Sequence, residues 1–407
     1  MTHVSPEPSP EGPATATAKP LPLTRTCPFD PPAELGRLRA HEPVSRLAYP
    51  DGSVGWLVTD HALARAVLTD QRFSARGELQ RSPVPYGLAE PEPARPGAFI
   101  FMDPPEHTRY RKHLTGQFTV RRMRLLEARI TEITEERLAA MRRGGQSADL
   151  VADFALPIPS LVICELLGVP YEDHGFFQQN SSAIFDLEQS AEEIQQAFGV
   201  LVGYLAELVA RKRAQPTDDL LSNLVAAGDL NDEELIGVVL LLLVAGHETT
   251  ANMLALGTFA LLRHPDQLEL LRKDPQLIDD AVEELLRYLS IMHVGLVRAA
   301  LEDVEVGGRT IKAGEVVTVS VAAANRDPKK FPDPERLDIT NPAGGHLAFG
   351  HGIHQCLGQQ LARIEMRVGI NGLLREFPGL RLAVPASDVP MRSDMSIYGV
   401  HRLPVTW

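Results

Sequence analysis

Apolar residues recur every three or four positions along most of the chain, the spacing that places them on one face of an α-helix. The segments with this spacing are predicted helices, and they span residues 31–39, 61–68, 125–142, 149–167, 171–187, 191–213, 231–263, 265–273, 277–289 and 361–377, with a further helix that starts at Pro105. In the helix over 231–263, apolar side chains surround the whole circumference between Ile236 and Ala245. Such a helix must cross the middle of the fold, so the chain is predicted to be mainly α.

The hydrophobic period shortens to two in a few segments, which are predicted to be β-strands. They span residues 53–58, 295–299, 304–306, 309–311 and 316–319, with a final pair at 380–384 and 397–403. Proline and glycine make two longer stretches irregular, 74–104 and 325–345. Because long loops inside a compact protein are usually functional or disordered, we expect 74–104 to form part of the wall of a ligand pocket, and a flexible surface excursion is the alternative.

Composition separates the N-terminus from the rest of the chain. Residues 1–28 are rich in Pro, Thr, Ala and Ser and contain no apolar run. Segments that cannot bury apolar surface stay unfolded, so 1–28 is predicted to be a disordered tail. No linker-like stretch interrupts residues 29–407, which are therefore predicted to form a single domain.

Charge and cysteine content narrow the class of protein. The 407 residues carry a formal charge of −13, which argues against binding to nucleic acid or to an anionic membrane. The strongest apolar run, 238–245, is much shorter than the roughly 20 residues of a membrane span. The three cysteines are far apart and odd in number, so they form no disulfide framework. We expect a soluble, cytoplasmic monomer with reduced thiols.

One of these cysteines, Cys356, lies in a glycine-rich stretch, 349–358, just before the predicted helix at 361–377. Glycine lets the backbone turn sharply and approach a flat ligand closely. The start of a helix favours an anion, a setting that lowers the pKa of a thiol from about 8.5. The resulting thiolate would suit iron as a soft axial ligand. An inert buried cysteine in a glycine-rich turn is the alternative.

The long apolar helix contains a polar interruption, Ala245-Gly246-His247-Glu248-Thr249-Thr250. The hydroxyl of Thr249 can bond back to the carbonyl of Ala245 and loosen the helix locally. Gly246 removes a side chain that would block close approach. These residues predict a hydrated notch in an apolar wall, and the alternative is a helix that merely departs from its amphipathic pattern.

Two further groups of charged residues stand out. Glu284 and Arg287 are three apart and share a helical face, for which a surface salt bridge is the ordinary explanation. His107 and Arg111 also share a face. They belong to a basic concentration that includes Arg109, Lys112, Arg121, Arg122 and Arg124. A solvated charged face would explain it.

Together and in this order, the motifs resemble those of the cytochrome P-450 family. Phe349, Gly352, Cys356 and Gly358 occupy every fixed position of its haem-binding signature. Ala245 to Thr249 matches its oxygen-activation segment, and the pair at 284 and 287 matches its Glu-x-x-Arg element. The resemblance implies a triangular helical prism with a small β-rich region. It is closest to the soluble actinobacterial members that hydroxylate macrolides, statins, vitamin D and other bulky apolar compounds.

The resemblance also implies a cofactor and residue roles. The cofactor is heme b, with Cys356 as the axial ligand of its iron. The residues implied around it are His107, Arg111, Ala245, Gly246, Arg298, Phe349, Gly350, His354, Leu357 and Gly358, of which His107, Arg111, Arg298 and His354 would hold the propionates. Glu248 and Thr249 would deliver protons to dioxygen. Glu284 and Arg287 would act structurally, with Arg336 as a third member.

The implied reaction inserts one atom of dioxygen into a bulky apolar molecule, by hydroxylation or epoxidation. NAD(P)H would supply two electrons through a ferredoxin reductase and a ferredoxin, which the basic patch near Arg109 and Arg122 would receive. Substrate contacts expected from position are Val84, Pro85, Phe99, Phe185, Leu242, Val294, Leu296 and Ile397, together with Ala245 and Thr249.

Three other functions remain open from the sequence. The first is a peroxide-using or oxygen-independent haem-thiolate enzyme, against which the intact Glu248–Thr249 pair counts. The second is a non-catalytic haem sensor, and the third is an all-α binding protein without a cofactor.

Overall fold

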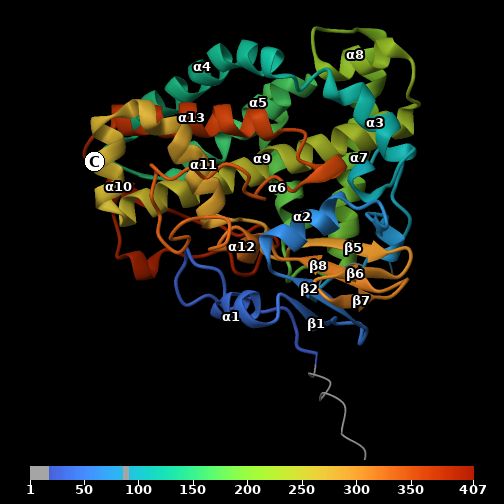
Figure 1. Cartoon of the computed structure of the whole chain (residues 1–407). Coiled ribbons are helices and arrows are strands. Elements are labelled where there is room, and N and C mark those ends of the chain that lie inside the picture. The colour runs from blue at the N-terminus through green and yellow to red at the C-terminus, as the bar shows by residue number, and fades with distance from the viewer. Residues whose placement is uncertain (1–17, 86–90) are drawn as a thin grey trace, which may run out of the picture.

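The computed structural model describes residues 18–85 and 91–407. Helices fill most of the molecule, and most strands gather at one corner (Figure 1). The helices are α1 (Ala33–His41), α2 (His61–Thr69), α3 (Glu106–Thr115), α4 (Val120–Gly144), α5 (Pro157–Leu167), α6 (His174–Phe185), α7 (Ala191–Ala214), α8 (Leu220–Ala227), α9 (Asp232–Arg263), α10 (Pro265–Lys273), α11 (Ile278–Leu289), α12 (Val321–Ala324) and α13 (Gln359–Glu376). The predicted mainly α class is confirmed.

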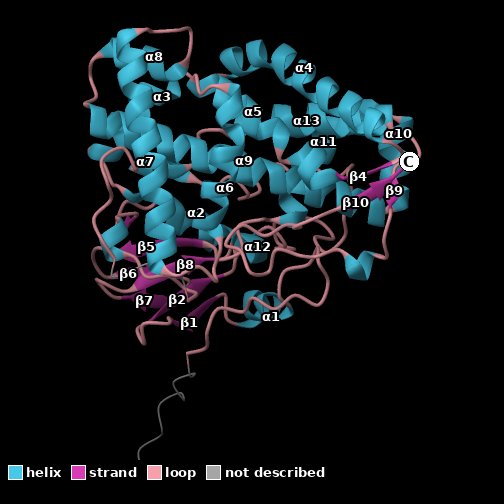
Figure 2. Ribbon diagram, turned by 180° about the vertical axis from the view of Figure 1, so that it is seen from behind, coloured by secondary structure: helices cyan, strands magenta, loops and turns pink. Residues whose placement is uncertain are grey.

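The β-rich corner is built on a five-stranded sheet of order β1-β2-β8-β5-β3. Its strands are β1 (Val44–Ala48), β2 (Val54–Val58), β3 (Phe73–Ser74), β5 (Leu296–Ala300) and β8 (Val316–Val319). Strands β2 and β8 are parallel, and the other neighbours are antiparallel. The hairpin β6 (Val304–Val306) and β7 (Arg309–Ile311) lies beside this sheet (Figure 2). A second sheet, on the other side of the molecule, joins β4 (Ser147–Asp149), β10 (Pro404–Thr406) and β9 (Arg381–Leu382).

The long helix α9 crosses the centre of the molecule, as predicted (Figure 1). It begins with a capping box, in which Asn231 Oδ1 accepts from the Glu234 amide at 3.0 Å and the Glu234 carboxylate accepts from the Asn231 amide at 2.9 Å. These bonds satisfy two of the amides that a helix start leaves without partners. Helices α5, α7, α11 and α13 pack against α9, so its position fixes that of the surrounding helices.

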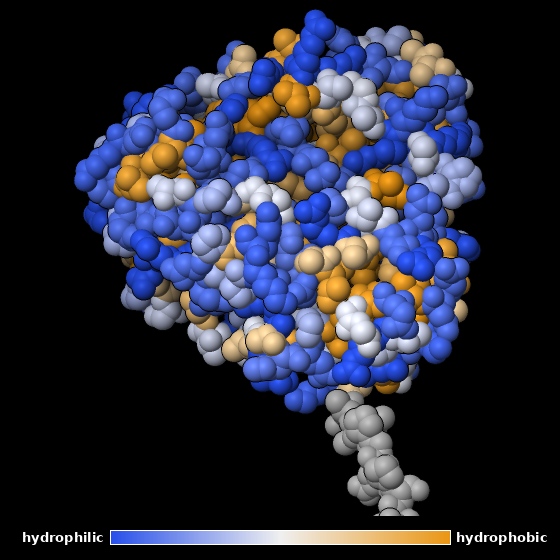
Figure 3. Space-filling model, in the orientation of Figure 1, coloured by the Kyte–Doolittle hydropathy of each residue, from blue (hydrophilic) through white to orange (hydrophobic). Residues whose placement is uncertain are grey.

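Among the described residues, α9 alone is long and apolar enough to cross a membrane. However, 56% of its most apolar window is buried against other parts of the protein. The face of the molecule seen in Figure 3 is mostly hydrophilic, with apolar groups in separate patches. We conclude that α9 is a core helix of this fold.

The helix predicted over 149–167 is wrong in its first half. Asp149 ends β4 by pairing with Pro404 of β10, and Val151–Ala155 winds as a π-helix. The α-helix starts only at Pro157, which lacks an amide proton and so suits a first helical turn. Pairing with a strand distant in sequence therefore outweighed the local helical pattern.

The predicted strand at 397–403 is also wrong. Ile397 forms an isolated bridge to Met292, and Val400 forms one to Met391. Because these short segments meet different partners, no continuous ladder develops between residues 397 and 403. The last strand, β10, instead begins at Pro404 and pairs with both β4 and β9.

The tail predicted for residues 1–28 extends too far. Residues 1–17 lie outside the described residues, but the chain from residue 18 onward packs on the body of the protein. The carbonyl of Lys19 accepts from the Ala48 amide at 2.9 Å, and Leu21 is buried with Leu47 of β1. For 18–28 the prediction of disorder is therefore wrong, because an added edge pairing and buried leucines hold the segment.

Candidate active site

The stretch around Cys356 forms a closed loop between the β-rich corner and α13. The Cys356 amide donates to the Phe349 carbonyl at 2.9 Å, which joins the two ends of the loop. Gly350 and Gly352 have φ angles of 68° and 74°, a region that side chains rarely adopt. A Cβ on Gly352 would lie 2.5 Å from the Leu68 carbonyl oxygen of α2. Glycine thus allows the loop to turn and to rest against α2.

The Cys356 thiol is exposed to solvent although protein atoms surround it closely. Burial raises the pKa of Cys356, while the amide of Gly358 and the guanidiniums of Arg111 and Arg363 act to lower it. The expectation of a lowered pKa is therefore wrong for the protein chain alone, because desolvation outweighs the helix start. A thiolate at this position depends on a cation bound to the sulfur, as a metal ion is.

The middle of α9 is open where the sequence predicts a notch. Ala245 is exposed, and Gly246 and Thr249 are half-buried, although the flanking turns of α9 are buried. Thr249 Oγ1 donates to the Ala245 carbonyl at 2.9 Å, as expected. A Cβ on Gly246 would lie 2.9 Å from Ile163 Cδ1. Its missing side chain therefore allows the close packing of α5 on α9.

Glu248 is buried at the same level of α9, with 2% of its surface exposed. Its Oε2 atom lies 3.0 Å from Nη2 of Arg392, which is also buried, and 3.4 Å from the side-chain amide of Asn252. The neighbouring His247 is also buried and bonds to Ser181 at 2.8 Å. Glu248 is therefore held in an internal ion pair, which the sequence pattern of α9 does not show.

Two histidines and two arginines meet beside the Cys356 loop. The rings of His107 and His354 lie 4.3 Å apart between centroids, and Arg111 donates to the Gln355 carbonyl at 2.5 Å. Both ring nitrogens of His107 and the Nδ1 atom of His354 are buried without a hydrogen-bond partner. Arg298, on β5, is buried nearby. We call His107, Arg111, Arg298 and His354 the basic cluster. Within residues 18–85 and 91–407, no carboxylate forms an ion pair with any of them.

The basic cluster is electrostatically strained. Burial, followed by the charges of Arg298, His107 and Arg111, lowers the pKa of His354 to about 3. Burial lowers the pKa of Arg298 to about 10, and Asp103 acts in the opposite direction. Buried cationic groups that repel one another and lack partners are unfavourable. An anion bound among them would relieve both the repulsion and the missing hydrogen bonds.

Glu284 and Arg287 form an ion pair in the core, with exposures of 0% and 1%. Nε and Nη2 of Arg287 each donate to Glu284 at 2.7 Å, Nη1 donates to the carbonyls of Asn325 and Pro334, and Nη2 also donates to the carbonyl of Arg336. Arg336 thus contributes its backbone, while its side chain is exposed. The prediction that Arg336 joins this pair is wrong for its guanidinium, because the guanidinium of Arg287 already donates to backbone carbonyls in the irregular segment.

The predicted basic patch is divided between the interior and the surface. Arg109 pairs with Glu234 at the start of α9 at 2.5 Å, and Arg111 faces the Cys356 loop. In contrast, Lys112, Arg121, Arg122 and Arg124 are exposed, and no carboxylate in the described part of the chain pairs with them.

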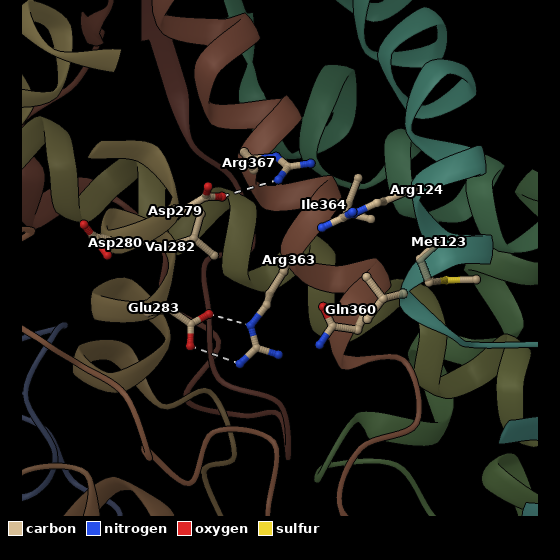
Figure 4. A pocket seen from close by; sticks show the side chains of 11 residues that line it. Met123, Arg124, Asp279, Asp280, Val282, Glu283, Gln360, Arg363, Ile364 and Arg367 are labelled. Atoms are coloured by element: carbon tan, nitrogen blue, oxygen red, sulfur yellow. Dashed lines mark hydrogen bonds and ion pairs between the residues drawn. The ribbon is translucent and has the colours of Figure 1, made fainter. Parts of the chain in front are cut away.

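A cavity of about 270 Å³ lies between α4, α11 and α13 (Figure 4). In it Arg363 pairs with Glu283 at 2.5 and 3.0 Å, and Arg367 lies 3.4 Å from Asp279. Arg124 reaches toward Ile364 without facing an acid. Gln360 and Arg363 stand on the first turns of α13, directly after the Cys356 loop, so this cavity opens beside that loop.

The predicted substrate residues fall into two neighbourhoods. Phe185 and Ile397 lie where the end of α6 reaches the C-terminal segment, since the Phe185 carbonyl accepts from Ser396 and Ile397 bridges to Met292, two residues before Val294. Val84 packs into the same apolar cluster as Val294. The second neighbourhood lies around the basic cluster and the Cys356 loop. There Phe99 is 6.2 Å from His107, and Leu296 faces Gly350. Leu242 is buried on α9, and Pro85 is exposed.

The segment that carries Phe99 lies directly on α9. A Cβ on Gly97 would lie 2.5 Å from the Glu234 carbonyl oxygen, and a Cβ on Gly237 would overlap the Pro96 carbonyl. Two backbones can approach this closely only where both lack side chains. Gly97 and Gly237 therefore determine how closely this segment packs on α9.

Sequence reasoning missed two site residues, Arg392 and Glu365. Glu365 lies on α13 with 1% exposure and faces Thr250 of α9. It falls four residues after Leu361, on the apolar face of the predicted helix, so an acid in that stripe was a usable signal. No comparable pattern surrounds Arg392, whose partner on α9 is far away in sequence.

Comparison with known proteins agrees with this geometry. The family model described as "Cytochrome P450" matches residues 174–404. "Cytochrome P450 105C1" of Streptomyces sp. is 54% identical over 380 residues, which cover 93% of this chain and 96% of that protein. "Vitamin D3 dihydroxylase" of Streptomyces griseolus is 44% identical, with coverage of 97% and 98%. The crystal structure of CYP105P1 in complex with filipin I aligns with a TM-score of 0.92 at 45% identity and covers 96% of this chain and 99% of that one.

The chain belongs to the cytochrome P450 family, and its fold is the P450 fold. Members of this family are haem-thiolate monooxygenases, so the chain is an enzyme with heme b as its cofactor. The alternative of a cofactor-free binding protein is wrong.

The residues present fit this cofactor. Haem carries two carboxylates, and the basic cluster offers hydrogen-bond donors that have no partner in the protein. A cysteine sulfur would hold the iron in this class of enzyme, and Cys356 is exposed.

Proposed function

We propose that this enzyme hydroxylates or epoxidises a bulky apolar small molecule, such as a polyketide, macrolide, statin or other secondary metabolite. The observation that carries the proposal is the basic cluster, whose buried donors need an anion, beside an accessible cysteine. Relatives named for a vitamin D3 and a filipin I complex point to substrates of this size and polarity. The apolar residues Phe185, Val294 and Ile397 would contact the substrate and supply most of its affinity.

In this proposal the chain's own residues bind and orient the cofactor. Cys356 ligates the iron, and His107, Arg111, Arg298 and His354 hold the propionates. When bound, haem supplies the chemistry that splits dioxygen and oxidises a C–H bond.

The open turn of α9 handles protons. Thr249 is half-buried with its hydroxyl bonded to Ala245, so it can hold a water molecule beside the substrate. Glu248, paired with Arg392 behind it, would accept and return protons. Water is otherwise kept out, because the turns on either side are buried.

Replacing the proposed iron ligand tests the assignment. We expect Cys356→Ser to abolish the absorption band that thiolate-bound haem gives in the reduced protein with carbon monoxide, and to abolish substrate oxidation. Cys27→Ser is the matched control and should keep both, because Cys27 lies in the N-terminal segment away from this loop. Undiminished oxidation by Cys356→Ser would refute the proposal.

We further propose that a ferredoxin and an NAD(P)H-dependent ferredoxin reductase supply the electrons. The docking surface would be the exposed Lys112, Arg121, Arg122 and Arg124, which lack acidic partners in the described chain and can attract an acidic protein. Arg109 is excluded from this surface, because it is bound to Glu234.

Charge reversal tests the docking surface. Arg122→Glu should slow reduction by ferredoxin about tenfold at low salt and less at high salt, because exposed charges are screened. Arg143→Glu is the control, since it removes an exposed arginine at the opposite end of the same helix, α4. Equal rates for the two variants would place the docking surface elsewhere.

We also propose that residues 29–407 act as one catalytic domain, because one large apolar cluster contains side chains from Phe29 to Val405. A cytoplasmic, monomeric enzyme is consistent with the mostly hydrophilic face in Figure 3 and the reduced cysteines.

A further inference from the structure

The roles proposed above leave one ion pair beside the Cys356 loop unexplained. Glu283 of α11 and Arg363 of α13 face each other in the cavity between α4, α11 and α13 (Figure 4). Nε and Nη2 of Arg363 donate to the Glu283 carboxylate at 2.5 and 3.0 Å, and Nη1 donates to the side-chain oxygen of Gln359 at 3.1 Å. Every nitrogen of this guanidinium has an acceptor, so the position of its positive charge is fixed.

The guanidinium of Arg363 lies against the Cys356 loop. Its central carbon is 4.5 Å from the centroid of the Phe349 ring, and the Phe349 carbonyl accepts from the Cys356 amide at 2.9 Å. Burial raises the pKa of the Cys356 thiol. After the Gly358 amide, the charges of Arg111 and Arg363 are what oppose this rise. The positive charge of Arg363 therefore acts on the sulfur.

Glu283 is the counter-charge of Arg363, and it is also held in place. Nε2 of His346 lies 3.2 Å from Glu283 Oε2, and Nδ1 of the same ring accepts from the Ala348 amide at 3.2 Å. The ring proton is therefore on Nε2, and His346 donates to the carboxylate. Burial acts to raise the pKa of Glu283, but the hydrogen bonds from His346 and Arg363 prevail and lower it to about 2. Glu283 is therefore a carboxylate at neutral pH.

Charges near a haem-thiolate unit change how readily it accepts an electron. The charges of ferric iron, porphyrin and thiolate sum to zero, and one added electron leaves a single negative charge. No bond forms or breaks in this step and no proton moves, and the electron comes from the proposed ferredoxin. A nearby cation therefore favours the reduced state and raises the reduction potential, whereas a nearby anion lowers it.

We propose that Arg363 raises the reduction potential of the bound haem from the α13 side of the Cys356 loop, and that Glu283 limits this effect. The inference rests on the proposed ligation of haem by Cys356. The two residues act in opposite directions, because they bring charges of opposite sign into the same cavity. A purely structural pair would behave differently, since the loss of either member breaks the same hydrogen bonds.

Three variants separate charge from packing. Arg363→Gln removes the cation, so the equilibrium constant for one-electron reduction should fall. Glu283→Gln removes the anion but keeps a hydrogen-bond acceptor, so the constant should rise. Arg363→Lys keeps the charge without the planar guanidinium, so it should retain most of the parent value.

The expected changes in the equilibrium constant are at most about tenfold, which is about 59 mV for one electron. They are no larger because the side chains of Arg363 and Glu283 are 26% and 28% exposed, so solvent screens part of each charge.

The neighbouring ion pair in the same cavity supplies matched controls. Arg367 lies one turn beyond Arg363 on α13, and Asp279 lies one turn before Glu283 on α11. Arg367→Gln and Asp279→Asn make the same charge changes farther from the Cys356 loop, so they should leave the reduction potential unchanged. Spectroelectrochemical titration of the haem-loaded proteins measures the potential, and the carbon monoxide band of each reduced protein shows that the thiolate ligand is retained.

Opposite shifts in Arg363→Gln and Glu283→Gln, with parent-like controls, would support the proposal. Shifts of the same sign would overturn it, and so would a shift in Arg363→Lys as large as that in Arg363→Gln. If Arg363→Gln binds no haem, Glu283→Gln decides alone, because an unchanged or lowered potential in that variant contradicts the proposal. A parent enzyme without the carbon monoxide band would instead refute the ligation by Cys356, so the two failures are distinguishable.

Discussion

Two buried groups of charge in this molecule have opposite hydrogen-bond states. At the Glu284–Arg287 pair, the fork of Arg287 is occupied by a carboxylate and three backbone carbonyls, and Glu284 also accepts from the Asp338 amide. In the basic cluster, both nitrogens of His107 and one of His354 have no partner. Buried polar groups are normally paired. In these two groups, the complete set of bonds accompanies the structural role of the Glu284–Arg287 pair, and the incomplete set accompanies the proposed binding of the propionates.

The largest effect on stability should come from breaking the fully hydrogen-bonded Glu284–Arg287 pair. Glu284→Ala leaves Arg287 as an unpaired charge in the core, and breaking such a pair costs about 3–5 kcal/mol. We expect a lower free energy of unfolding, measured by chemical denaturation, and poor recovery of haem-loaded protein. Asp280→Ala, an exposed position on the same helix, should change stability by less than about 0.5 kcal/mol. Similar losses in the two variants would contradict the structural role of the pair.

A smaller and opposite effect on the stability of the haem-free protein should follow from a substitution in the basic cluster. Arg298→Leu removes a desolvated cation, so we expect the haem-free protein to keep or gain stability. The haem-loaded protein should release its cofactor more readily, because a charged hydrogen bond of about 1.5–3 kcal/mol is lost. Haem transfer to an acceptor protein measures this release. Arg309→Leu, an exposed change on β7, is the control. Equal haem retention by these two variants would contradict the assignment to a propionate.

The third effect concerns acid. Burial and the charge of Arg25 lower the pKa of His293 to about 4, compared with about 6.5 in an unfolded chain. Between these values the unfolded state binds a proton that the folded state does not, so stability falls as pH falls from 6.5 toward 4. His293→Phe, which keeps the stacking on Tyr398, should remove about 2 kcal/mol of that loss at pH 5.

His354 should respond to acid in the same direction in the haem-free protein, because its pKa is also lowered, to about 3. A bound propionate would favour its charged form. Haem should therefore reduce the acid sensitivity that comes from His354 and leave that of His293 unchanged. Denaturation curves at pH 5 and pH 7, with and without haem, measure both. If haem left the acid sensitivity of the protein unchanged, the comparison between the two groups would be contradicted.

Much of this molecule could be predicted from sequence because its signals are local. The course of α9, the bounds of β6, β7 and β8, and the place of Cys356 follow from periodicity, turn residues and spacing. The errors lie where distant segments decide. The irregular start before α5 and the missing strand at 397–403 depend on pairing with β10 and Met292, which no local window contains.

The chemistry of the site divides in the same way. The family resemblance implied the four residues of the basic cluster. The raised pKa of Cys356, the Ile163 contact of Gly246 and the Arg392 partner of Glu248 depend instead on neighbours far away in sequence. Desolvation and packing are sums over those neighbours. A sequence motif can therefore name a reactive group without fixing its protonation or its partners.

The contact between Gly97 and Gly237 has a consequence for any redesign of this enzyme. At this contact no side chain separates the loop from α9, because both residues are glycines. Phe99, an expected substrate contact, follows Gly97 by two residues, so this contact also helps to set the position of Phe99 relative to α9. A methyl group at position 237 would overlap the Pro96 carbonyl, so Gly237→Ala should displace this segment without changing any of the expected substrate contacts.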